Sequence, residues 1–114
     1  MADMTMKEFY EHEVEWTKGQ IEWYTKEIAY ETECLESSRK DDRELVEHIW
    51  AKGPIQAVDV MCFGRNGKGK DGRGYKSRET REYLAKRKKW YRRRKHYVQE
   101  LARYEALLAK EEMV

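Results

Sequence analysis

The sequence predicts an all-α protein, a long antiparallel and coiled-coil-like helical hairpin with a short intervening helix and a basic glycine-rich loop. Charged residues make up 40% of the 114 positions and apolar residues 39%, with a single proline and a mean hydropathy of −1.09. This composition is typical of long, solvent-exposed helices. The length suits one domain spanning residues 1–114. Finally, an aromatic residue recurs at every seventh position in two stretches, and seven residues are nearly two helical turns.

The recurring aromatic residues predict how the two long helices pair. The first stretch carries Phe9, Trp16, Trp23 and Tyr30, and the second carries Tyr83, Trp90, Tyr97 and Tyr104. If the helices run antiparallel, one register places all four pairs opposite each other, from Phe9 with Tyr104 through to Tyr30 with Tyr83. Aromatic residues in a repeating apolar stripe usually form a core. We therefore expect this aromatic ladder to hold the hairpin together.

The first helix, expected over residues 5–36, has a second apolar stripe beside the aromatic one. This aliphatic stripe consists of Val14, Ile21, Ile28 and Leu35. Together the two stripes cover roughly 200° of the helical wheel, which is wider than contact with one helix requires. The excess apolar surface predicts a homo-oligomer, with a dimer as the first expectation.

The connection between the long helices should contain a helix and an apolar segment. The polar run over residues 37–42 interrupts the apolar pattern, so we expect a separate short helix over 39–51, ended by Lys52-Gly53-Pro54. The apolar segment over 55–63 fits either a short helix or an extended strand. In both cases it is apolar enough to be packed.

A basic glycine-rich loop is predicted over residues 64–76, followed by the second long helix over 77–110. Five of the seven glycines lie in this loop, interleaved with four cations: Arg65, Lys68, Lys70 and Arg73. Ser77 is a suitable N-cap for the helix that follows. Backbone amides beside glycine can cradle phosphates, which makes the loop a candidate anion site, with a plain linker as the alternative.

Cations of the last helix extend this candidate site. Arg78 and Arg81 supply charge at its start, and the run over 86–95 holds eight basic side chains that could follow a phosphate backbone. Arg87 and Arg94 point into the apolar arc, where Glu27 and Gln20 would face them as ion pairs and hydrogen bonds that set the register. Alternatively, Arg87 and Arg94 line an anion pocket beside Trp90.

The sequence offers little support for catalysis, metal binding or membrane insertion. The three histidines are scattered, and Cys34 and Cys62 lack zinc-site spacing, so we expect no catalytic residue, metal or cofactor. The Gly67-x-Gly69-x-x-Gly72 spacing resembles a dinucleotide fingerprint, but no βαβ unit surrounds it. No signal peptide or membrane-length apolar run is recognisable, which predicts a cytoplasmic protein.

Charge is distributed unevenly along the chain, and this bears on the expected partners. Residues 1–50 hold 14 acidic and 6 basic side chains, whereas residues 51–114 hold 8 acidic and 18 basic ones. The leading hypothesis is therefore a non-enzymatic protein that binds a polyanion, either nucleic acid or a nucleotide-type ligand. The alternative is a protein–protein adaptor or inhibitor that docks on a host protein. Size and charge, but no motif, suggest a phage or mobile-element counter-defence protein acting in the host cytoplasm.

Overall fold

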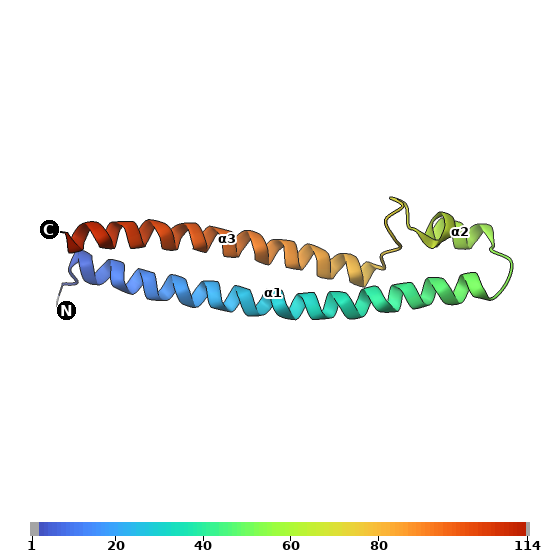
Figure 1. The fold of residues 1–114 in the computed structure, drawn as a ribbon, viewed down its shortest axis with the longest axis horizontal. Helices are drawn as coiled ribbons and strands as arrows, with labels where there is room; N and C mark the ends of the chain where they lie inside the picture. The colour runs from blue at the N-terminus through green and yellow to red at the C-terminus, as the bar shows by residue number, and fades with distance from the viewer. Residues whose placement is uncertain (1–2, 114) are drawn as a thin grey trace. The chain divides into compact units, whose positions relative to one another are not determined.

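The computed structural model describes residues 3–113, and all of its regular elements are helical. In chain order they are α1 (Met6–Ala51), α2 (Ala57–Phe63), the 3-10 turn η1 (Arg65–Gly67) and α3 (Arg78–Glu112) (Figure 1). No strand occurs within the described residues. The predicted all-α hairpin with two long helices and a short one between them is confirmed.

Contacts within the chain fall into two units, and each unit contains part of α1 and part of α3. We call residues 3–30 and 87–113 the terminal unit, and Glu31–Lys86 the loop unit. Inside each unit, the segments of α1 and α3 lie side by side and run in opposite directions (Figure 1). The loop unit also contains α2 and the glycine-rich loop.

The predicted break over residues 37–42 is wrong, because α1 is one continuous helix that extends as far as Ala51. Serine and aspartate each reduce helix stability by only about 0.5 kcal/mol, so packing can offset them. Ser38 and Asp42 are both buried, and each is hydrogen-bonded to the Thr80 hydroxyl. The polar residues that resembled a helix start are therefore buried contacts of one long helix.

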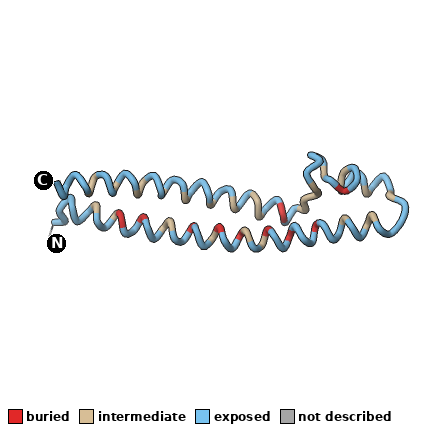
Figure 2. Tube along the Cα trace, viewed as in Figure 1, coloured by how far each residue is buried: buried red, intermediate tan, exposed pale blue. Residues whose placement is uncertain are grey.

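The buried side of α1 is not the aromatic stripe that the heptad spacing indicated. From Tyr24 to Asp42 the buried positions follow alternating steps of four and three residues, and Val14 and Thr17 continue the same two seven-residue series, which is the spacing of a helix-packing seam (Figure 2). They are Val14, Thr17, Tyr24, Ile28, Glu31, Leu35, Ser38 and Asp42. By contrast, Phe9, Trp16, Trp23 and Tyr30 remain between 40% and 60% exposed. The aromatic stripe of α1 therefore lies beside the seam.

Two rungs of the predicted ladder are present in the terminal unit. The Trp16 and Tyr97 rings meet edge to face with centroids 5.8 Å apart, and Trp23 meets Trp90 in the same manner at 5.7 Å. Tyr24, which the ladder omitted, stacks on Tyr97 at 5.6 Å with an interplanar angle of 19°. The antiparallel register is therefore correct for these rungs, and Tyr24 is the buried residue between them.

The outer rungs differ from this pattern or stay predictions. Tyr104 contacts Tyr10, with ring centroids 6.4 Å apart, while Phe9 packs against Tyr10 at 5.7 Å. Tyr10 takes the place expected of Phe9 because it lies on the seam side of α1. The pairing of Tyr30 with Tyr83 stays a prediction.

The apolar segment after Pro54 forms a helix, which decides between the two predicted conformations. Gln56 N–H donates to the Asp59 carboxylate at 2.9 Å and closes the first turn of α2. The expectation that this segment is packed is largely wrong, because Val58 is 61% exposed and Met61 is 77% exposed. Phe63 is the exception, with its ring 4.7 Å from that of Tyr75. A seven-residue helix on one side of a loop has too few neighbours to cover all its apolar residues.

Candidate anion-binding site

The glycine-rich loop is hydrogen-bonded to itself. Gly69 N–H donates to the Phe63 carbonyl at 2.8 Å, and Gly74 N–H donates to the Lys68 carbonyl at 2.7 Å. Further amides, those of Gly67, Lys68 and Gly72, also donate to loop carbonyls. An amide that already donates within the loop is not free to hold a phosphate. The predicted amide cradle stays a prediction, and because these five amides already donate, we expect anion binding here to depend on side chains.

Close packing explains why glycine occupies several positions of the loop. Gly67 is buried with a φ of +71°, and a Cβ atom there would overlap Cγ1 of Val46 on α1. A Cβ on Gly64 would likewise meet the backbone of Gly69. Only glycine allows such close backbone approaches together with a positive φ. The loop is thus a compact structure seated on α1.

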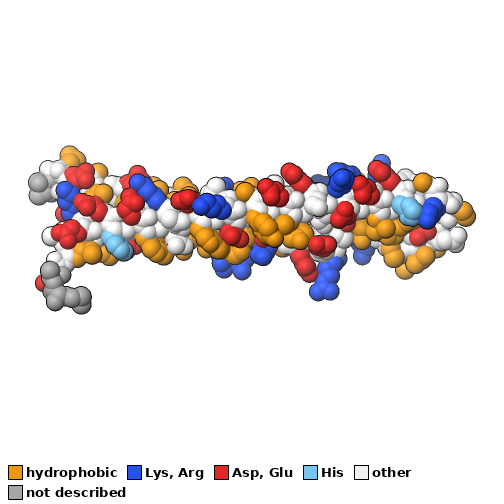
Figure 3. Space-filling view, turned by 90° about the horizontal axis from the view of Figure 1, so that it is seen from below, with side chains coloured by type: hydrophobic (Ala, Val, Ile, Leu, Met, Phe, Trp, Pro, Cys, Tyr) orange, Lys and Arg blue, Asp and Glu red, His pale blue; other side chains and the backbone are white. Residues whose placement is uncertain are grey.

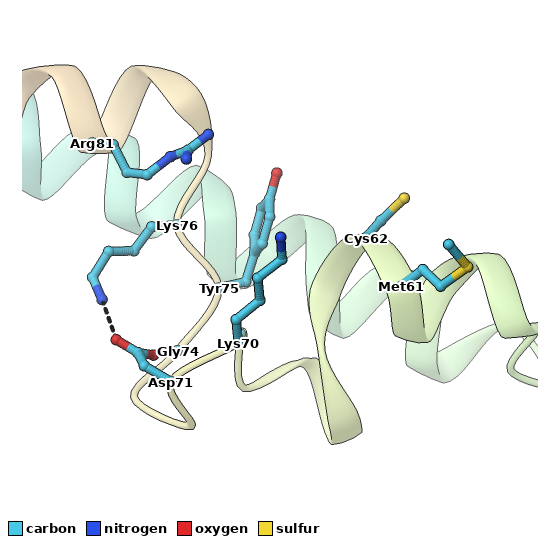
Figure 4. Close-up of a pocket in the computed structure, with 9 residues that line it drawn as sticks. Met61, Cys62, Lys70, Asp71, Gly74, Tyr75, Lys76 and Arg81 are labelled. Carbon is cyan, nitrogen blue, oxygen red and sulfur yellow. Dashed lines mark hydrogen bonds and ion pairs between the residues drawn. The ribbon is translucent and has the colours of Figure 1, made fainter.

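A cavity of about 570 Å³ opens between α2, the loop and the first turn of α3 (Figure 4). In the close-up, Tyr75 and Lys70 stand between α3, which carries Arg81, and α2, which carries Cys62 and Met61. All the lining residues belong to the loop unit: Met61, Cys62, Gly69, Lys70, Asp71, Gly74, Tyr75, Lys76 and Arg81. The cavity therefore combines cations, one carboxylate, one aromatic ring and an apolar wall.

One of the three cations at the cavity is neutralised by the single carboxylate. Lys76 Nζ lies 3.5 Å from Asp71 Oδ2, and Arg73 N–H donates to Asp71 Oδ1 at 3.0 Å. The hydrogen bond from the Arg73 amide, together with the positive charge of Lys76, holds the pKa of Asp71 below its ordinary value. Within residues 3–113, no carboxylate pairs with Lys70 or Arg81. These two side chains leave the cavity positively charged.

The remaining predicted cations of the loop unit lie outside this cavity. Arg65, Lys68 and Arg73 are exposed on the loop, and none of them lines the cavity. Arg78 is held by Glu82, whose carboxylate lies 3.1 Å from Arg78 Nε. Of the six cations predicted for this part of the site, only Lys70 and Arg81 converge on one cavity.

Buried hydrogen bonds fix the start of α3, and with it the position of Arg81. Ser77 Oγ accepts from Thr80 N–H at 3.2 Å, which confirms the predicted N-cap. The Thr80 hydroxyl, with none of its side chain exposed, donates to Asp42 Oδ2 at 2.6 Å and lies 2.5 Å from the Ser38 hydroxyl. Asp42 Oδ2 also accepts from Ser77 N–H at 3.1 Å. A carboxylate of α1 thereby caps α3.

The other predicted site residues, Arg87, Trp90 and Arg94, form a separate group in the terminal unit. Lys89 and Arg93, rather than Arg94, lie over the Trp90 ring, at 5.6 and 5.3 Å from its centroid. Arg94 lies 5.2 Å from the centroid of Tyr91 and donates to the Thr25 hydroxyl at 3.5 Å. The predicted anion pocket of Arg87 and Arg94 beside Trp90 stays a prediction. The predicted pairs of Arg87 with Glu27 and of Arg94 with Gln20 stay predictions.

A second cavity, of about 360 Å³, lies in the terminal unit and was not predicted. It is lined by Tyr24, Arg92, Arg93, His96 and Tyr97. Sequence reasoning also missed Tyr75 and Met61 at the larger cavity. One signal for Tyr75 is visible in the sequence, because it is an aromatic residue between the last loop glycine and the N-cap of α3.

Among residues 3–113, no helix is long and apolar enough to cross a membrane. No group of three histidine, cysteine, aspartate or glutamate side chains in that part of the chain could hold a metal ion. No protein family, curated protein or solved structure matches the chain.

Proposed function

We propose that this protein is a non-enzymatic binding protein for an anionic ligand, either nucleic acid or a nucleotide-type molecule. The ligand binds at the glycine-rich loop and the start of α3. One observation carries the proposal, namely that Lys70 and Arg81 border one cavity together with the ring of Tyr75. Cations beside an aromatic ring are what a phosphate joined to a base requires.

In this proposal, side chains rather than loop amides hold the phosphate. The guanidinium of Arg81 can donate two parallel hydrogen bonds to phosphate oxygens, and the Lys70 ammonium adds a compact positive charge. The hydrogen-bonded loop positions Lys70, and the Ser77–Thr80–Asp42 contacts position Arg81. Both cations are therefore presented by structured backbone.

By itself, the terminal unit also offers exposed basic side chains of α3 to a polyanion. In the terminal unit this outer face carries Lys88, Lys89, Arg92, Arg93 and Lys95. Contacts between such side chains and phosphates release bound counterions, so affinity should fall steeply with salt. A role in counter-defence within a host cell is the biological setting that we propose, on size and charge alone.

Titration with fluorescent single-stranded DNA, RNA and nucleotides at two salt concentrations tests the proposal. We expect binding of at least one of these ligands, weakened tenfold or more in a Lys70→Ala, Arg81→Ala double variant. A double variant of Lys18→Ala and Lys26→Ala removes the same charge from exposed positions on α1 and serves as the control. If no ligand bound, or if both double variants lost the same affinity, the proposal would be wrong.

An adaptor or inhibitor function is the second candidate, and the exposed apolar surface of α2 favours it. Val58, Val60 and Met61 are 61%, 40% and 77% exposed. Apolar residues gathered at a surface often mark a protein-binding site. In this case, a Val58→Glu, Met61→Glu variant should no longer bind the partner protein, while its affinity for anions should be unchanged. The acidic outer residues of α1 offer another docking surface: Glu11, Glu15, Glu22, Glu33 and Glu36.

We also propose that the protein forms a homodimer through the exposed aromatic stripe of α1. Figure 3, which looks onto α1, shows hydrophobic side chains at the surface between acidic and basic ones. Trp16 and Trp23, each about half exposed, are the largest side chains of the stripe. Analytical ultracentrifugation should detect a dimer that dissociates in a Trp16→Glu, Trp23→Glu variant. A monomer at all concentrations would contradict this expectation.

A further inference from the structure

We propose that the cavity of the loop unit is a binding site for one phosphorylated planar ring, such as a nucleoside 5′-monophosphate. This inference rests on the proposed anion-binding function and makes it specific. The phosphate would lie between Lys70 and Arg81, and the ring would lie against Tyr75 and the apolar wall of α2. The cavity would then recognise a discrete ligand, whereas cations spread along a helix face would bind any polyanion.

The size of the cavity favours a small ligand. Its volume of about 570 Å³ lies within the range of roughly 300–1,000 Å³ that is usual for small-molecule sites. Residues 61–81 supply every lining group, so the site is built by one short stretch of chain. Because the loop is hydrogen-bonded and Gly64, Gly67 and Gly69 are closely packed, this shape exists before a ligand arrives. A preformed site reduces the entropy lost on binding.

The charges at the cavity favour one phosphate group over several. Lys70 and Arg81 contribute two positive charges, which match a phosphate monoester that carries about −1.5 to −2 at pH 7. The charge of Lys76 is already neutralised by Asp71, 3.5 Å away. The electrostatics therefore select a monophosphate over a triphosphate.

The ring-binding part of the site combines an aromatic side chain and a thioether. Tyr75 is held edge to face by Phe63 and is only partly buried. Met61, on the α2 side of the cavity, is 77% exposed. Aromatic rings stack on nucleic-acid bases, and methionine sulfur also makes favourable contacts with rings. Exposed Met61 and half-buried Tyr75 would both be covered by a planar ring between them.

A phosphorylated ring could come from two sources, and calorimetry distinguishes between them. The first source is the free nucleotide, and the second is the 5′-phosphorylated end of an oligonucleotide. The titrants are the four nucleoside 5′-monophosphates, adenosine, adenosine triphosphate, inorganic phosphate, and one oligonucleotide with or without a 5′-phosphate. We expect at least one monophosphate to bind tenfold or more tightly than adenosine, adenosine triphosphate and inorganic phosphate. A 5′-phosphorylated oligonucleotide that binds tenfold more tightly than its 5′-hydroxyl form also supports the site.

Matched variants locate the binding. Lys70→Ala should weaken monophosphate binding tenfold or more, whereas Lys68→Ala, in the same loop but outside the cavity, should change it less than twofold. Tyr75→Phe keeps the ring and should bind, while Tyr75→Leu keeps an apolar side chain and should not. Because the loop unit contains six of the seven glycines, the glycine amide signals in ¹H–¹⁵N spectra report whether each variant keeps the loop fold.

The outcomes separate this inference from the proposed function. Monophosphates that bind no more tightly than inorganic phosphate, or equal losses from Lys68→Ala and Lys70→Ala, would overturn the cavity site. If oligonucleotides then still bound with a steep dependence on salt, the general polyanion-binding function would stand. Absence of binding by all titrants, with the loop signals intact, would overturn both.

Discussion

Replacing Gly67 with alanine tests whether close packing against α1 holds the glycine-rich loop in place. At this position φ is +71°, and an added Cβ would overlap Cγ1 of Val46. A left-handed backbone disfavours alanine by about 1–2 kcal/mol, and forcing a methyl group into packed space adds about 1–3 kcal/mol. The substitution should therefore destabilise the loop by about 2–5 kcal/mol.

Gly72 provides the matched control for this substitution. Its φ of +74° is nearly the same, but no atom lies within 4 Å of the position that a Cβ would take. Gly72→Ala should therefore show only the backbone effect of about 1–2 kcal/mol. The difference between the two variants measures the contact with Val46 alone.

Native-state hydrogen exchange of the Gly69 and Gly74 amides is the suitable assay, because both donate to carbonyls at the base of the loop. Each 1.4 kcal/mol lost should speed exchange about tenfold. Adding Val46→Ala to the Gly67→Ala variant should restore part of the protection by making room for the methyl group. Equal exchange in the Gly67 and Gly72 variants, or no restoration by Val46→Ala, would refute the packing argument.

Three further predictions concern buried or charged groups of the loop unit. Thr80→Val removes the hydroxyl that donates to Asp42, so urea denaturation should show a loss of about 1–3 kcal/mol, whereas Thr80→Ser should lose only about 1 kcal/mol. Glu31 is 1% exposed and pairs with Lys86 at 3.4 Å, so Lys86→Ala should destabilise the fold by about 1–3 kcal/mol. Glu31→Leu should instead leave the melting temperature unchanged or raise it, and a large drop would contradict this. The pKa of Asp71 is lowered in the folded protein. The carboxylate therefore stabilises the fold at neutral pH, and this contribution is lost as pH falls through the lowered pKa. Carboxyl NMR should show Asp71 titrating at a lower pH than a free aspartate.

The amino-acid sequence by itself determined that the chain forms two long helices and that they pair in opposite directions. Heptad aromatics predicted that Trp16 meets Tyr97 and that Trp23 meets Trp90, because residues seven apart share one side of a helix. Ser77 was recognisable as an N-cap because its short side chain can accept a hydrogen bond from an amide of the first helical turn. These are local properties, and neighbouring residues are sufficient to specify them.

Only the tertiary structure decided which side of α1 is buried and where α1 ends. A seven-residue spacing identifies a line along a helix, but several such lines exist, and contact with α3 selects two neighbouring lines, one through Tyr24 and one through Leu35. Ser38 and Asp42 looked like a helix boundary because their partner, Thr80, lies about forty residues away in sequence. Long-range hydrogen bonds of this kind are invisible to a local pattern.

The same distinction applies to the candidate site. The glycines and cations of the loop were evident, and so was their suitability for an anion. The sequence could not show that the Gly69 and Gly74 amides already donate to the carbonyls of Phe63 and Lys68, nor that Lys70 and Arg81 share a cavity with Tyr75. These facts depend on how the chain turns back on itself between α2 and α3. The sequence therefore determined which chemical groups are present, and the tertiary structure decided which of them meet, because only folding brings distant side chains to one cavity.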